Sequence, residues 1–114
     1  MSHKLTSNSS VIYNAERQLS GVLEIIPEQI TYQNDGVSYH NVMLNCPVRV
    51  SGSNDFATGL NYNISENDWD VFFASVTLTS TDEFSKQEEA ALKYVLTQID
   101  GDWGLTESDW TYSV

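Results

Sequence analysis

The segment EQITYQNDGVSYHNVMLNCPVRV, residues 28–50, decides the fold. Its Asp35-Gly36 pair is the strongest turn signal in the chain, because Asp-Gly tolerates the positive φ angles of a tight hairpin turn. From Val42 onward, apolar and polar residues alternate, a period that is typical of a half-buried strand. The segment therefore predicts an antiparallel hairpin formed by residues 28–33 and 37–50.

Shorter strands are expected on both sides of this hairpin. Their apolar positions predict strands at residues 11–14, 19–26 and 60–64. Pro47 cannot donate a backbone hydrogen bond, which places its strand at a sheet edge or beside a bulge. The side chains that should point into the core from this strand are Val42, Leu44, Cys46 and Val48. A buried and unreactive thiol is the expected state of Cys46, the one cysteine of the chain.

The clearest helix is predicted at residues 85–99. Ser85 and Glu88 match a capping box, and Gly101 follows as a helix stop. The apolar stripe of this helix is formed by Leu92, Val95, Leu96 and Ile99.

Residues 65–79 carry two competing patterns. The spacing of Trp69, Phe72, Phe73 and Val76 is helical, whereas Phe72, Ala74, Val76 and Leu78 alternate as in a strand. We expect a short helix at 66–74 and a short strand that ends at Thr79. The predicted fold class is thus α+β, with a mainly antiparallel sheet packed against the helix at 85–99 and a second short helix near 66–74.

The chain has 114 residues, of which 40% are hydrophobic, and this amount of apolar material suits one domain. We expect residues 11–114 to form it and the polar residues 1–10 to form a flexible or docking arm. No stretch approaches the roughly 20 apolar residues of a membrane span, and residues 1–10 lack the apolar centre of a signal peptide. A cytoplasmic location is therefore expected.

Charge separates the two halves of the chain. The total of 16 acids and 5 bases gives a net charge of −11. Residues 1–65 contain five acids and three bases, a net of −2, and residues 66–114 contain eleven acids and two bases, a net of −9. Direct binding to nucleic acid or to an anionic membrane is disfavoured, because both need clustered Lys or Arg. A basic protein surface is the expected partner.

Each of the three tryptophans follows an aspartate, and two of these pairs share a longer frame. Residues 64–69 and 105–110 share one pattern: an aliphatic residue, a hydroxyl residue, Glu, a small polar residue, Asp and Trp. One interpretation makes Ser65 and Thr106 helix N-caps that precede a core-facing Trp. In the other interpretation, each Asp-Trp pair presents a partner protein with an aromatic side chain beside a negative charge, since Trp is common in interface hot spots. The two interpretations are compatible.

The sequence offers little for catalysis or metal binding. Asp100-Gly101-Asp102 begins like a calcium loop, but Leu105 and Thr111 stand where that loop needs Gly and Glu. No metal-binding His spacing, phosphate-binding loop or Gly-flanked nucleophilic serine is present. We therefore predict a protein that is not an enzyme and requires neither cofactor nor metal.

Two functions remain open. The size, acidity and lack of catalytic motifs resemble those of phage or mobile-element proteins that bind and inhibit, such as DNA-mimicking anti-defence and anti-CRISPR proteins and nuclease-immunity proteins. The alternative is a phage virion subunit of a tail, neck or capsid cement, for which self-assembly is expected. For the first function, the predicted partner-binding residues are Glu66, Asp68, Asp70, Asp100, Asp102, Trp103, Glu107, Asp109 and Trp110.

Overall fold

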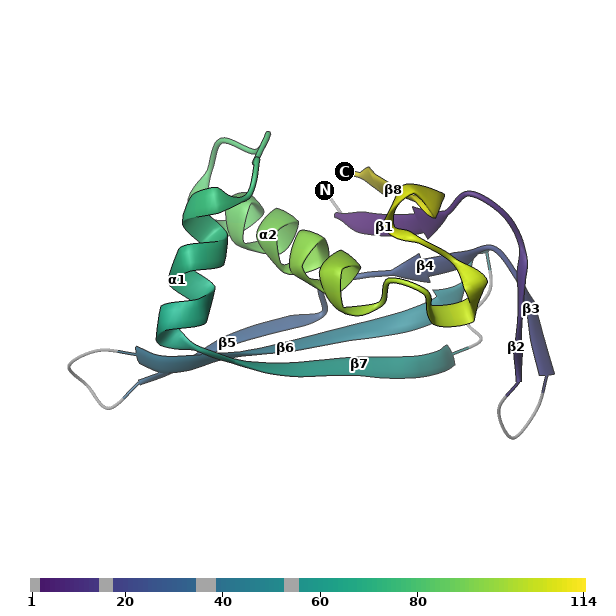
Figure 1. The fold of residues 1–114 in the computed structure, drawn as a ribbon, viewed down its shortest axis with the longest axis horizontal. Coiled ribbons are helices and arrows are strands. Elements are labelled where there is room, and N and C mark those ends of the chain that lie inside the picture. Colours follow the sequence, from purple (N-terminus) through teal and green to yellow (C-terminus); the bar gives the residue numbers. More distant parts are fainter. Residues whose placement is uncertain (1–2, 15–17, 35–38, 53–55) are drawn as a thin grey trace.

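In the computed structural model, which describes residues 3–14, 18–34, 39–52 and 56–114, an antiparallel sheet packs against the long helix α2 (Figure 1). The strands are β1 (Lys4–Ser7), β2 (Val11–Asn14), β3 (Gln18–Gly21), β4 (Leu23–Ile25), β5 (Gln29–Asn34), β6 (Tyr39–Val50), β7 (Phe56–Ser65) and β8 (Trp110–Ser113). The helices are α1 (Glu66–Ser75) and α2 (Glu83–Gln98), followed by two 3-10 turns, η1 (Asp102–Gly104) and η2 (Glu107–Asp109). The predicted α+β class is confirmed.

The central strand of the sheet is β6. The predicted pairing of β5 with β6 is confirmed, with Gln29 opposite Asn45, while the turn at 35–38 lies outside the described residues. β7 pairs with the other side of β6 along its whole length. Of the two alternatives expected from Pro47, the sheet edge is wrong, and the bulge agrees with an irregularity of the β6–β7 pair close to Pro47. Pro47 is tolerated because the neighbour of β6 changes there from β5 to β4, and a register shift against β7 follows directly after Val48.

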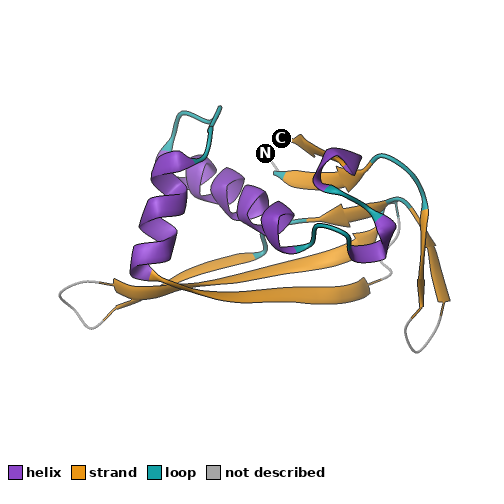
Figure 2. Ribbon diagram, viewed as in Figure 1, coloured by secondary structure: helices purple, strands orange, loops and turns teal. Residues whose placement is uncertain are grey.

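The N-terminal residues differ from the expected arm. β1 lies between β4 and β8, and Leu5 is fully buried. β1 has one buried apolar side chain and pairs with strands from distant parts of the sequence, so no local pattern predicted it. The strand predicted at 19–26 is also divided into β3 and β4, on either side of Val22. β2 and β3 form a separate hairpin that extends away from the sheet (Figure 2).

Both helices begin at side-chain caps. The helix predicted at 66–74 is confirmed as α1, and Ser65 Oγ accepts a hydrogen bond from the Asp68 N–H at 3.2 Å. α2 begins two residues earlier than predicted, because Asp82 rather than Ser85 is its N-cap. The Asp82 carboxylate accepts a hydrogen bond from the Ser85 N–H at 3.0 Å. Neither helix is long and apolar enough to cross a membrane, within the described residues.

The strand expected to end at Thr79 is absent, and a loop connects α1 to α2. The backbone N–H groups of Thr79 and Ser80 donate to the carboxylate of Glu89 on α2 at 2.9–3.0 Å, so they are not available to a neighbouring strand. Lys93 Nζ lies 2.7 Å from the same carboxylate, which is completely buried. Burial opposes the charged form of Glu89, but the Lys93 contact and these N–H groups outweigh it and lower its pKa to about 2.

The predicted core is confirmed except at one position. The four inward residues of β6 and the helix residues Leu92, Val95 and Ile99 are buried, with Ala90 and Ala91 between them. Leu96 is only half-buried, because it lies at the margin of the α2 stripe. Burial raises the pKa of the Cys46 thiol to about 12, so that the thiolate is disfavoured.

Candidate functional site

The two copies of the Asp-Trp frame are capped turns in the structure. Ser65 caps α1, and Trp69 one turn later is 1% exposed and donates its Nε1–H to the Tyr32 hydroxyl at 2.9 Å. Thr106 forms a full capping box with Asp109, whose carboxylate accepts the Thr106 N–H at 2.8 Å. The capping interpretation of the repeat is therefore confirmed at both sites.

The tryptophans of the second half form an edge-to-face pair. The ring centroids of Trp103 and Trp110 are 6.1 Å apart. Trp110 is only 7% exposed and belongs to the core, whereas Trp103 is half-buried and retains accessible surface. Gly101 and Trp103 both have positive φ, which directs the chain sharply away from the end of α2. Of the two predicted anchors, Trp103 is the one whose ring a partner can reach.

Most of the predicted acidic residues lie at the surface of the helices and the 3-10 turns. Their hydrogen bonds divide them into two groups. Asp100 accepts a hydrogen bond from the Glu107 N–H at 3.3 Å, and Asp109 is the cap described above. Asp68 and Asp102 are exposed, and neither carboxylate accepts a hydrogen bond in the described part of the chain. The fully exposed acids of the second half are Asp68, Asp70, Asp82, Glu83, Asp100, Asp102 and Glu107.

The structure brings Asp68 and Asp102 to the same aromatic pair, although they are far apart in sequence. Tyr62 of β7 and Tyr94 of α2 meet edge to face with centroids 5.8 Å apart. Burial raises the pKa of both phenols, and the nearby negative charge of Asp102 adds to this at Tyr62 and that of Asp68 at Tyr94. The two rings form a half-buried aromatic pair, and the charges of Asp68 on α1 and Asp102 on η1 each act on one of them.

Two exposed apolar side chains were not singled out from the sequence. Val71 on α1 is 62% exposed and Phe84 in the first turn of α2 is 68% exposed, the highest values among the large hydrophobic side chains described. Phe84 directly follows the exposed acids Asp82 and Glu83. It lies outside the apolar stripe predicted for the helix, which was formed by Leu92, Val95, Leu96 and Ile99. These side chains add apolar anchors to the acidic surface.

The basic residues do little to neutralise this surface. Lys4 pairs with Glu24 at 2.9 Å and Arg49 lies 3.7 Å from Glu28, both in the first half of the chain. In the second half, Lys93 is engaged with the buried Glu89, which leaves Lys86 of α2 as the one other base among eleven acids. We define the helical acidic surface as the exposed acids of α1, α2, η1 and η2 together with Val71, Phe84 and Trp103. Its negative charge is largely uncompensated.

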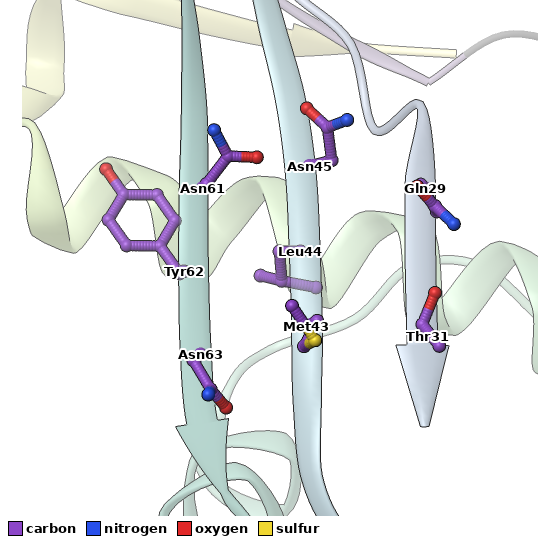
Figure 3. A pocket seen from close by; sticks show the side chains of 8 residues that line it. All are labelled: Gln29, Thr31, Met43, Leu44, Asn45, Asn61, Tyr62 and Asn63. Carbon is purple, nitrogen blue, oxygen red and sulfur yellow. The ribbon is translucent and has the colours of Figure 1, made fainter. Parts of the chain in front are cut away.

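On the opposite face of the sheet, the central outward rows of the three long strands carry no charged side chain, and Arg49, near the end of β6, lies beyond them. The outward positions on β5, β6 and β7 form cross-strand rows, such as Gln29–Asn45–Asn61 and Thr31–Met43–Asn63. Figure 3 shows these side chains on one side of the sheet and α2 behind it. They line a shallow hollow of about 350 Å³. We call this face, with the adjoining row of Gln33, Asn41 and Ser65, the neutral face.

A buried polar cluster joins the two ends of the chain. His3 is 3% exposed, its Nδ1 forms a hydrogen bond with the Tyr112 hydroxyl of β8, and its Nε2 lies 3.8 Å from Glu88 of α2. Lys93 Nζ lies 5.3 Å from the centroid of the Tyr112 ring. The cluster connects β1 and β8 to α2. Within the described residues, no three His, Cys, Asp or Glu side chains gather as a metal site would require.

No protein-family model matches the chain, and no curated protein or solved structure is significantly similar to it.

Proposed function

We propose that this protein is a non-enzymatic binding protein whose helical acidic surface docks on a basic surface of a nucleic-acid-binding protein. The observation that carries the proposal is the separation of charge in the fold. Exposed acids gather on the helical side, whereas the central outward rows of β5, β6 and β7 carry no charged side chain. Acids spread only for solubility would not avoid these rows.

The composition of the surface supports an inhibitory mode of binding. Carboxylates such as Asp68 and Asp102 would lie where a nucleic acid places its phosphates, and Lys or Arg of the partner would contact them. Phe84 and Trp103 supply apolar contact between the charges, as hot-spot residues do. Occupation of a nucleic-acid-binding site is then the functional consequence.

The test uses the tagged full chain to capture proteins from a bacterial lysate. We expect basic nucleic-acid-binding proteins to be retained at low salt, released at high salt and displaced by duplex DNA, because screening acts over roughly 8 Å at physiological ionic strength. The Asp68→Asn/Asp102→Asn variant should retain much less of them. The matched control is Glu24→Gln/Glu28→Gln, which removes the same charge from acids that already face a base.

Equal loss in both variants would assign the binding to net charge alone and contradict a defined surface. Rings or larger oligomers, formed without any basic partner, would favour the alternative of a virion subunit.

A further inference from the structure

β7 is the longest sheet edge in the described part of the chain. It has ten residues, pairs with β6 on one side, and has no described strand on the other. The other edges of the main sheet are β5, with six residues, and β8, with four. Figure 1 shows β7 along the border of the molecule. A free edge presents unpaired N–H and C=O groups that another strand can bond.

From Thr58 onward, β7 has no feature that protects this edge, and the register shift against β6 is confined to its first residues. Exposed edges are commonly blocked by charged side chains, prolines or bulges. β7 reads FATGLNYNIS, without a charged residue or a proline. By contrast, the other long edge strand, β5, is directly preceded by a proline and a charged residue, Pro27 and Glu28. In a chain of net charge −11, a ten-residue edge without any charge is available to another strand.

The apolar side of the sheet is also incompletely covered at this edge. The inward residues Val42 and Leu44 of β6 are at most 2% exposed, whereas Leu60 and Tyr62 of β7 are only half-buried. Figure 3 shows the Tyr62 ring extending past the outer side of β7. An added strand would cover this apolar surface as well as pair the backbone.

The occupant that best fits the edge is a second copy of β7. In an antiparallel pair centred on Asn61 or Tyr62, even-numbered residues lie opposite even-numbered ones. Leu60, Tyr62 and Ile64 of the two copies then share the apolar side, and Asn61 and Asn63 share the neutral face. Charge favours the same choice, because contact through the helical acidic surface would oppose the acids of two identical chains.

We propose that two copies of this chain associate through antiparallel pairing of their β7 strands, which joins the two sheets into one continuous sheet about a two-fold axis. The contact is isologous, so it closes at the dimer. Its small extent predicts weak association that depends on protein concentration. This inference goes beyond the proposed function: the contact is made by the backbone and side chains of β7, and of the predicted acids Asp102 lies near it, beside Tyr62.

The test is sedimentation equilibrium of the full chain over a wide concentration range. We expect a monomer–dimer equilibrium that strengthens as salt rises, because salt screens the repulsion between two acidic chains. Asn61→Asp/Asn63→Asp and Asn61→Lys/Asn63→Lys should each weaken dimerisation about tenfold or more, since either register places like charges opposite each other. An equimolar mixture of the two variants should restore association.

The matched control is Gln29→Asp/Thr31→Asp, which adds the same charge to the same two rows at the opposite edge of the neutral face. It should dimerise like the wild type. With the unmodified chain, hydrogen exchange at β7 amides should slow as protein concentration rises. A monomer at every concentration, concentration-independent exchange at β7, or equal weakening by the control would overturn the proposal. The proposed function is tested separately, because its binding weakens with salt.

Discussion

Glu89 shows how one buried side chain determines the path of a loop. Its carboxylate accepts the N–H groups of Thr79 and Ser80 and pairs with Lys93. These bonds fix the connection between α1 and α2 where a strand was expected. The alternation of residues 72–78 could not predict this outcome, because the partner of those backbone groups lies ten residues further along the chain.

We expect Glu89→Gln to lower the free energy of unfolding at neutral pH by about 3 kcal/mol, because it leaves Lys93 without its buried partner. The pKa of Glu89 falls from an ordinary 4.5 to about 2. Its charged form therefore stabilises the fold fully above the unfolded pKa, and this contribution is lost as the pH falls through about 2.

Urea denaturation of the wild type and the variant, at neutral pH and at successively lower pH, measures this effect. The difference between the two proteins should shrink on acidification below pH 4.5. A difference that stays constant down to pH 2 would contradict the assigned role of the carboxylate.

At the scale of elements, sequence periodicity predicted β5, β6, β7 and both helices because each contains several apolar residues on one face. It failed for β1, which has one buried apolar residue, Leu5, and is held by strands from distant parts of the chain. It also failed for His3, whose burial depends on Tyr112 at the other end of the sequence. Long-range pairing of short segments leaves no local signal.

Removal of residues 1–7 distinguishes a sheet strand from a docking arm. We expect the shortened chain to lose cooperative thermal unfolding, because β4 and β8 would lose their common neighbour and the pocket of Leu5 would open. Circular dichroism during heating measures this change. A melting temperature equal to that of the full chain would mean that β1 contributes nothing to the fold.

At the scale of the whole molecule, the candidate site was predicted in outline from composition. The net charge of −9 after residue 65 located the acidic half, since the helices and turns of that half lie together on one side of the sheet. The sequence could not show which acids are caps, that Trp110 is buried, or that Phe84 is exposed. Those distinctions depend on which residues meet in space.

The same acids must therefore divide into two classes with different effects on stability. Asp68→Asn/Asp102→Asn removes two exposed charges without a described hydrogen bond, and it should leave the melting temperature unchanged or slightly higher, because like charges repel in this region. Asp100→Asn/Asp109→Asn removes the same charge but weakens two turns, and it should cost about 1–2 kcal/mol. Thermal unfolding of the two variants at low and high salt compares them directly. High salt should reduce the stabilisation that both variants gain from the loss of charge repulsion. The loss of stability from the weakened turns should remain in the Asp100→Asn/Asp109→Asn variant. Equal melting temperatures would show that the caps contribute no more than any other surface charge, and that net charge alone determines the stability of the acidic half.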